Sequence, residues 1–257
     1  MGKGVLFLIT LLTTGLSVVS CNKSGQARIM LTPVNTDSGL ISGQDSIPSA
    51  DTSKTHTYLA LGDSYTIGAS VAVNDRYPVQ TVSLLRTAGY SFQDPEIIAT
   101  SGWTTTNLLE AIQGKTAAVP YDVVTLLIGV NNQYQGGTAD NYRDELTRLL
   151  KQCIQLSGNK ASHVIVISIP DYSVTPFAKG LNRTYISSQI DAFNKINHDV
   201  SDSYQTLYLN VTDESREALS DPSLIASDGL HFSGKEYGIW ASALKPMMEK
   251  VITGNKD

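Results

Sequence analysis

Residues 123–128 read Val-Val-Thr-Leu-Leu-Ile, which is the most apolar run of strand length in the chain. Apolar and β-branched residues follow one another here without the alternation of a half-exposed strand, as in strands that are covered on both faces. Gly129 follows directly, where such a strand would end. The stretch therefore predicts a strand inside a parallel sheet that is packed between two layers of helices.

Segments of strand length and of helix length alternate on both sides of this run. Such alternation requires right-handed crossovers and gives a parallel sheet sandwiched by helices. We therefore expect the α/β class, as a three-layer α/β/α fold with a five-stranded parallel sheet. The other strands are expected at residues 58–61, 96–99, 163–168 and 206–211, and the helices at residues 77–88, 106–112, 139–156, 185–203 and 235–252. Thr184 is placed to cap the helix that begins at residue 185.

The composition excludes one class of partner. The chain has 257 residues, a net charge of −5 and no run of Lys or Arg. An acidic protein without a basic patch has no electrostatic basis for binding nucleic acid. Hydrophobic residues make up 41% of the chain and charged residues 17%, as in an ordinary globular protein. We therefore expect a folded protein with no nucleic-acid partner.

The first twenty residues have the pattern of a secretory signal. Lys3 provides a positive charge, and residues 5–16 form an apolar stretch that is shorter than the ~18–20 residues needed to span a membrane. The sequence Val-Val-Ser-Cys at residues 18–21 resembles the lipobox of bacterial lipoproteins, in which the cysteine becomes the lipidated first residue of the mature chain. A plain signal peptide with a cysteine near its end is the alternative.

These features divide the chain into three parts. Residues 1–20 are interpreted as the signal peptide, residues 21–55 as a lipidated Cys21 with a flexible tether, and residues 56–257 as the folded domain. The tether is rich in Ser, Thr, Asp, Gly and Pro and has little apolar periodicity. We therefore expect a protein of the cell envelope, held on a bacterial membrane through Cys21 and facing the periplasm or the cell surface.

The second cysteine and three of the four histidines carry no sign of chemistry. Cys153 lies on the apolar face of the helix 139–156, so it is expected to be a small buried side chain rather than a nucleophile. His56, His163 and His198 lack the spacing of metal ligands. We therefore expect no metal site.

The loops after the predicted strands are where an α/β sheet of this kind binds its ligands. Ser64 follows the first strand and offers a hydroxyl. His231, in the loop before the last helix, is a base that can take the hydroxyl proton, and Asp228 can hold its other ring nitrogen. One loop thus supplies both the base and the group that orients it.

An acyl transfer also needs donors for the oxyanion of its tetrahedral intermediate. The candidates are the backbone N–H groups of Ser64 and Gly102 and the side-chain amide of Asn131. Each residue alone has a structural explanation, since Ser64 could cap a helix and His231 could be a partly buried structural histidine. Their occurrence at successive strand ends favours a joint catalytic role.

Together these residues resemble the motifs of the SGNH or GDSL-type hydrolases. Gly-Asp-Ser at 62–64 resembles the first block of the family, Gly102 the glycine of the second, Gly-Val-Asn at 129–131 the third, and Asp-Gly-Leu-His at 228–231 the last. The resemblance covers residues 57–252. It implies a flavodoxin-like fold with strand order 2-1-3-4-5, hydrolysis of carboxylic esters and no metal or organic cofactor. Family substrates include acetylated sugars, lysophospholipids and thioesters.

Two positions depart from the pattern of the family. Tyr65 stands where Leu is frequent, and we expect it to narrow or roof the acyl pocket. Asn132 replaces the Asp that usually follows Gly-x-Asn, so the proposed donor Asn131 is kept while a carboxylate is lost from the loop. The aromatic residues that flank these elements are expected to line the substrate groove: Trp103, Tyr134, Phe177 and Phe232.

The leading interpretation is a serine esterase that acts through an acyl-enzyme on a small-molecule or glycan ester. The alternative of a different class is a catalytically silent, lipid-anchored carbohydrate-binding protein on the same fold. A flavodoxin-like nucleotide binder is a third possibility, but it leaves Ser64, Asn131 and His231 unexplained.

Overall fold

A computed structural model describes residues 54–254, and the structural statements below concern that part of the chain. The predicted signal sequence, Cys21 and all but the last two residues of the predicted tether lie outside the described residues.

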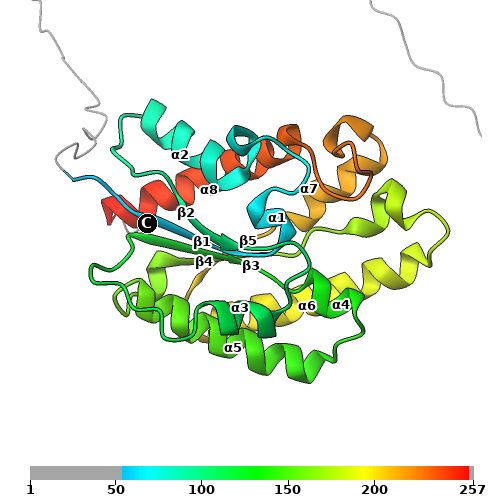
Figure 1. Ribbon diagram of the computed structural model, residues 1–257, viewed down its shortest axis with the longest axis horizontal. Helices are drawn as coiled ribbons and strands as arrows, with labels where there is room; N and C mark the ends of the chain where they lie inside the picture. The colour runs from blue at the N-terminus through cyan, green and yellow to red at the C-terminus, as the bar shows by residue number, and fades with distance from the viewer. Residues whose placement is uncertain (1–53, 255–257) are drawn as a thin grey trace, which may run out of the picture. The chain divides into compact units, whose positions relative to one another are not determined.

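Five parallel strands form one sheet in the order β2-β1-β3-β4-β5 (Figure 1). This confirms both the five-stranded parallel sheet and the strand order implied by the resemblance. The strands are β1 (Tyr58–Gly62), β2 (Glu96–Ala99), β3 (Val123–Leu127), β4 (Val164–Ile167) and β5 (Leu207–Leu209). All residues of β1, β3 and β4 are buried, which explains their unbroken apolar runs. Gly62 pairs with Leu127, so the loops that follow β1 and β3 start at the same edge of the sheet.

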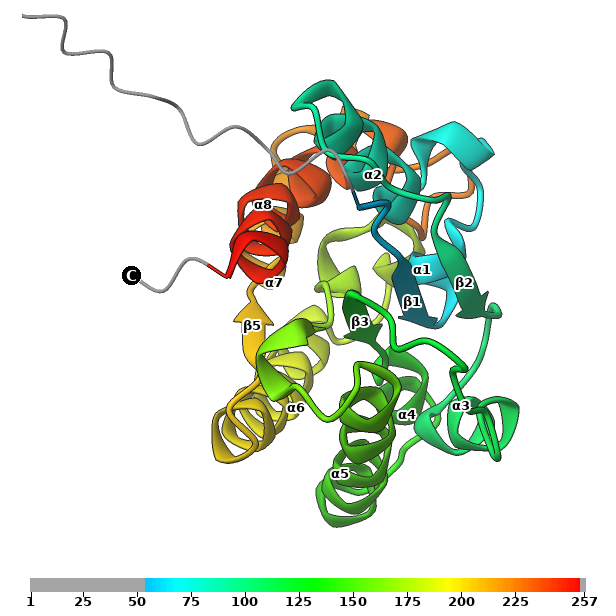
Figure 2. The ribbon, with the colours of Figure 1, turned by 90° about the vertical axis from the view of Figure 1, so that its left-hand side faces the viewer.

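Helices cover both faces of the sheet, as Figure 2 shows in a view along the layers. α2 and α8 pack against each other on one face, whereas α3, α5 and α6 lie on the other (Figure 1). The long helices are α2 (Tyr77–Thr87), α3 (Thr105–Ala111), α5 (Ala139–Leu156), α6 (Arg183–Ser203) and α8 (Gly234–Thr253). The three-layer α/β/α architecture is therefore as predicted.

Three short helices follow directly after strands where the sequence indicated only loops. Four or five residues are too few to show a helical period, so the apolar pattern did not reveal them. They are α1 (Ser64–Ile67) after β1, α4 (Val130–Tyr134) after β3 and α7 (Thr212–Arg216) after β5. Single turns of 3₁₀-helix complete the connections: η1 (Val73–Asp75), η2 (Ala161–His163), η3 (Tyr172–Val174), η4 (Pro176–Ala178), η5 (Glu217–Leu219) and η6 (Pro222–Leu224).

The predicted cap of α6 was wrong by two residues. The side chain of Asn182 accepts a hydrogen bond from the backbone N–H of Tyr185 at 3.0 Å, and Thr184 lies inside the first turn. Asn and Thr are both good N-cap residues, so their order in the sequence did not decide between them.

An aromatic cluster joins α8 and α2 to the segment that follows β1. It consists of Tyr65, Tyr77, Phe232, Tyr237 and Trp240, none of them more than 2% exposed. The rings of Tyr237 and Trp240 lie 5.0 Å apart, and those of Tyr65 and Phe232 lie 5.8 Å apart. Large buried rings contribute strongly to packing. The cluster therefore fixes α1 against the helix that follows the predicted acid–base loop.

The cysteine, the helices and the possible metal ligands of this part of the chain can be described briefly. Cys153 is completely buried in α5, as expected, and burial raises the pKa of its thiol to about 12, which keeps the thiol protonated. Between residues 54 and 254, no helix has the length and apolar character needed to cross a membrane. The same residues contain no group of three His, Cys, Asp or Glu side chains that could hold a metal ion.

Candidate active site

The predicted site residues come together at the carboxyl edge of the sheet. Ser64, Gly102, Asn131 and His231 line one pocket of about 310 Å³. Asp228 lies behind His231 and contacts its ring. Residues spread over more than 160 positions of the sequence thus meet because the parallel strands end at one edge.

The Gly-Asp-Ser sequence shapes the start of α1. A Cβ atom on Gly62 would lie 2.3 Å from the carbonyl oxygen of Leu127 and 2.1 Å from Oγ1 of Thr66, so only glycine fits. Asp63 caps the helix, because its side chain accepts the backbone N–H of Tyr65 at 3.0 Å. Ser64 is then the first residue of the helix. Its hydroxyl lines the pocket and makes no hydrogen bond within residues 54–254.

Asp228 and His231 form the second part of the site, on the loop before α8. Oδ2 of Asp228 lies 2.6 Å from Nδ1 of His231. Oδ1 of Asp228 accepts the backbone N–H groups of Leu230 and His231, each at 2.9 Å. Gly229 sits between them with a φ of +72°, in the left-handed region that glycine favours. This turn holds the carboxylate and the imidazole in one rigid unit.

The two aspartates near Ser64 have opposite pKa shifts. Burial raises the pKa of Asp63 to about 7, and its Oδ2 has no hydrogen-bond partner. Burial acts in the same direction on Asp228, but the hydrogen bonds from His231, Ser70 and two backbone N–H groups outweigh it and hold the pKa well below its usual range. Asp228 is therefore the carboxylate that stays ionised beside His231. An ionised partner at Nδ1 keeps the proton there and leaves Nε2 as the acceptor.

The third part of the site is a group of N–H donors. Within the described residues, the backbone N–H groups of Ser64 and Gly102 donate to no protein acceptor. Gly102 has a φ of +85°, again in the left-handed region. Asn131, on α4, uses one amide N–H to bond the carbonyl of Trp103 at 2.9 Å, which leaves the other for the pocket. These donors could hold an oxyanion.

Asn132 points away from the pocket and is only 9% exposed. Its Oδ1 accepts the backbone N–H of Thr105 at 3.0 Å, and its Nδ2 donates to Oγ1 of the same residue at 2.6 Å. The hydroxyl of Thr105 in turn donates to Glu145. An amide can both accept and donate a hydrogen bond here. The Asp typical of the family could only accept, and it would place a second carboxylate beside Glu145. Glu145, on α5, thus explains why residue 132 is Asn rather than Asp.

The rest of the pocket is mainly apolar. Tyr134, Tyr172 and Phe177 form an aromatic rim with ring centroids 6.1–6.4 Å apart. Tyr134 is 57% exposed and Phe177 is 42% exposed, so these rings are open to solvent. Tyr65 also lines the pocket but is 2% exposed, which makes it part of the floor rather than a roof. The remaining lining residues are Ser101, Val130 and Leu230.

Two of the four aromatic residues expected to line the groove do not do so. Phe232 is completely buried in the aromatic cluster, because it precedes α8 and packs against Trp240. Trp103 is half-buried against the core, and its contribution to the site is the carbonyl that accepts the amide of Asn131.

Ser70 is a site residue that the sequence did not predict. Its hydroxyl donates to Oδ2 of Asp228 at 2.6 Å, so it shares this oxygen with His231. Ser70 has a φ of +64°, which is uncommon for a residue other than glycine. No motif surrounds it, and the 158 positions that separate it from Asp228 are bridged only by the fold.

Comparison with known proteins adds a family and a set of similar folds. A model of the GDSL-like Lipase/Acylhydrolase family matches residues 60–239. Similar solved structures include an acetylxylan esterase from Geobacillus stearothermophilus (20% identity, TM-score 0.56, covering 75% of this chain and 94% of that chain). Others are a lipase/acylhydrolase from Enterococcus faecalis (18%, 0.58, 77% and 96%) and TesA (16%, 0.59, 76% and 99%). At these identities the structures establish the fold alone. No curated protein matches the chain.

The adjacent residues Asn131 and Asn132 are expected to differ in function. Asn131→Ala should lower kcat for an ester by about 10²–10³ with little change in KM, because it removes a donor that acts in the transition state. Asn132→Ala should instead lower stability by about 1–3 kcal/mol, because it leaves the buried N–H of Thr105 without a partner. Kinetics and thermal melts of both variants measure this difference. A kcat defect confined to Asn132→Ala would contradict the assignment.

Ser70 offers a pair of variants that separates its hydrogen bond from its backbone strain. Ser70→Ala and Ser70→Gly should both lower kcat about tenfold, because each removes a hydrogen bond to the charged Asp228. Ser70→Gly should be the more stable of the two by roughly 1 kcal/mol, because glycine adopts the positive φ without a steric cost. Wild-type kcat in both variants would show that the hydroxyl does not support Asp228.

Proposed function

This chain belongs to the GDSL-like lipase/acylhydrolase family and is a carboxylic ester hydrolase, and we propose that it removes short acyl groups from carbohydrate through an acyl-enzyme on Ser64. The observation that carries the proposal is the pocket itself. It is about 310 Å³ in volume, has Ser64, His231 and the N–H donors at one place, and is otherwise lined by apolar and aromatic groups.

In the proposed first step, the hydroxyl of Ser64 attacks the ester carbonyl carbon and passes its proton to Nε2 of His231. The carbonyl oxygen becomes an oxyanion, which accepts hydrogen bonds from the backbone N–H groups of Ser64 and Gly102 and from the amide of Asn131. A single donor of this kind is worth about 2.7–4 kcal/mol of transition-state stabilisation. Asp228 remains ionised and stabilises the imidazolium.

The intermediate then breaks its bond to the alcohol oxygen, which takes the proton from His231 as it leaves. The product of this step is an acyl ester on Ser64. A water molecule then enters, gives a proton to His231 and attacks the acyl carbon, and collapse of the second intermediate returns the proton to Ser64 and releases the carboxylic acid. Besides the ester and this water molecule, the steps use only side chains and backbone groups of this chain.

The preference for short acyl groups rests on Tyr65. Leu is frequent at this position in the family, and a buried tyrosine at the floor leaves less depth for an acyl chain. The aromatic rim of Tyr134, Tyr172 and Phe177 is the surface proposed to hold the alcohol. Its two exposed rings, Tyr134 and Phe177, offer broad apolar faces to the flat sides of a sugar. An acetylxylan esterase among the similar structures supports this class of substrate.

A series of p-nitrophenyl esters tests this function, with Ser64→Ala as the inactive control. The kcat/KM for the acetyl ester should exceed that for the octanoyl ester by at least about tenfold, since even one methylene that fits poorly in a hydrophobic pocket costs roughly 1–3 kcal/mol. Ser64→Ala should keep its melting temperature and lose turnover, and a fluorophosphonate should label Ser64 in the wild type. Glycan binding without turnover by the wild type would support the carbohydrate-binding alternative instead.

The floor of the pocket can be tested with a matched pair. Tyr65→Leu should raise the octanoyl-to-acetyl ratio of kcat/KM about tenfold, because it opens the floor. Phe232→Leu removes a ring from the same aromatic cluster but does not touch the pocket, so it should leave this ratio unchanged. Equal ratios in the two variants would count against Tyr65 as the selecting residue.

We also propose that the enzyme is a lipoprotein of the cell envelope, anchored through Cys21. The support is the Val-Val-Ser-Cys sequence at residues 18–21 behind a short apolar segment. Stable anchoring takes more than one acyl chain, which a fully processed lipoprotein carries. Cys21→Ser should abolish incorporation of a labelled fatty acid and release the protein from the membrane fraction. A wild type that takes up no label and fractionates as soluble protein would contradict the anchor.

A further inference from the structure

The segment that carries two of the three rings of the aromatic rim begins at a buried carboxylate. Asp171 lies shortly after β4 and is completely buried, yet it does not line the pocket. The residues that follow it, up to Ala178, form the turns η3 and η4 and include the rim residues Tyr172 and Phe177. We call residues 171–178 the wall segment. Nothing in the proposed chemistry uses Asp171, so its burial calls for another explanation.

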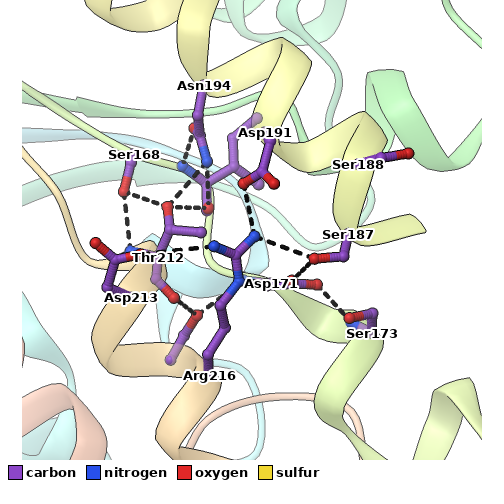
Figure 3. A network of polar contacts seen from close by, with 12 residues as sticks. Ser168, Asp171, Ser173, Ser187, Ser188, Asp191, Asn194, Thr212, Asp213 and Arg216 are labelled. Carbon is purple, nitrogen blue, oxygen red and sulfur yellow. Dashed lines mark hydrogen bonds and ion pairs between the residues drawn. The ribbon is translucent and has the colours of Figure 1, made fainter. Parts of the chain in front are cut away.

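Arg216, at the end of α7, holds this carboxylate (Figure 3). Its Nε donates to Oδ2 of Asp171 at 3.0 Å, and its Nη2 donates to Asp191 on α6 at 2.6 Å. Ser187, also on α6, donates to the same Oδ2 at 2.6 Å, and Oδ1 accepts the backbone N–H of Ser173 at 2.9 Å. The carboxylate of Asp171 is therefore fully partnered by three separate elements.

Charge balance in this network depends on Arg216. Its guanidinium lies within 4 Å of three carboxylates, those of Asp171, Asp191 and Asp213. Burial alone would raise the pKa of Asp171, but the hydrogen bonds from Ser187, Ser173 and Arg216 lower it instead. Without the guanidinium, Asp171 would keep two hydrogen bonds and would face Asp191 with no cation between them. Repulsion between the two carboxylates would then push the side chain of Asp171 away from Asp191, while the backbone N–H of Asp171 would keep its bond to Ser215.

The wall segment has further attachments. The backbone N–H of Asp171 donates to Oγ of Ser215 at 2.9 Å, and the hydroxyl of Tyr172 donates to Oε1 of Gln133 at 3.0 Å. Arg183 donates to the carbonyl of Thr175 at 3.0 Å. The backbone N–H of Phe177 donates to the carbonyl of Gly229 at 2.8 Å, directly beside Asp228. The segment thus spans the distance between the Arg216 network and the loop of the acid–base pair. A shift at Asp171 acts first on Tyr172, the next residue along the chain, and reaches Phe177 through the turns η3 and η4.

We propose that Arg216 is a positioning residue for the substrate: by holding Asp171 it fixes the wall segment, and the wall segment sets how the rim binds the alcohol part of the ester. This rests on the proposed function, since it assigns the rim to the alcohol. Arg216 contacts neither the pocket nor Ser64, Asp228 or His231. We therefore expect Arg216 to affect KM and the choice among alcohols. The chemical steps on Ser64 do not require it.

Two esters of acetic acid distinguish this role from a general contribution to stability. p-Nitrophenyl acetate has an aromatic alcohol that reaches the rim, whereas methyl acetate does not extend beyond the reacting groups. Arg216→Met should raise KM for p-nitrophenyl acetate about five- to tenfold while KM for methyl acetate stays within about twofold, and kcat should change little for either. Arg216→Lys, which keeps the charge, should give an intermediate KM.

A double-mutant cycle with Phe177→Ala tests whether Arg216 acts through the rim. Phe177 is 42% exposed, so its truncation should not disturb folding. If the proposal holds, Arg216→Met adds little to the KM of Phe177→Ala, because the ring that it positions is already absent. Asp122→Asn is the control for stability. Asp122 is partly buried and partnered at the opposite end of the sheet, where it accepts the backbone N–H of Thr57 at 2.9 Å. This variant should lower the melting temperature without changing either KM.

Several outcomes would overturn the proposal. These are an unchanged KM for p-nitrophenyl acetate, an equal rise for both esters, or fully additive effects with Phe177→Ala. If Arg216→Met does not fold, Ser187→Ala removes the hydrogen bonds to Asp171 and Arg216 and is subject to the same comparison. Turnover by the wild type and its loss in Ser64→Ala establish ester hydrolysis on Ser64 separately. An unchanged KM in the Arg216 variants then counts against the positioning role alone.

Discussion

The close approach of β1 and β3 at their carboxyl ends is the constraint on which the rest of the site depends. Gly62 leaves no room for a side chain between the carbonyl of Leu127 and Thr66. Because the two strands end side by side, the helix that begins at Ser64 and the helix that carries Asn131 start at the same edge. A hydroxyl and an amide that are far apart in the sequence therefore face one pocket.

Electrostatics at this edge depends on how each carboxylate is partnered rather than on its distance from the pocket. Asp63 is buried with one oxygen unpartnered, and its pKa rises. Asp228 and Asp171 accept several hydrogen bonds each, and their pKa values fall in spite of burial. Asp228 and Asp171 are thus the two ionised carboxylates, and each has a different function. One carboxylate orients His231, and the other secures the wall segment through Arg216.

The sequence alone determined the architecture. Buried parallel strands carry unbroken apolar runs, and most of the helices are long enough to show their own period. Five strands, the five longest helices and their order along the chain could therefore be read directly. The four motif positions also indicated the candidate nucleophile, base and oxyanion donors, which the structure brings to one pocket at the ends of the strands. Short helices such as α1 and α4 were not predicted, because one turn leaves no periodic signal. The cap at Asn182 was assigned to Thr184, because both residue types cap helices well.

Only the tertiary structure decided which side chains surround these motifs. Phe232 and Tyr65 are both aromatic and adjacent to motif residues, yet one is enclosed in the core and the other forms the pocket floor. Ser70 and Arg216 act on carboxylates 158 and 45 positions away, at places that carry no motif. A periodic pattern records which face of an element is buried, and a motif records local chemistry. Contacts between distant loops depend on how the elements pack, which neither pattern contains.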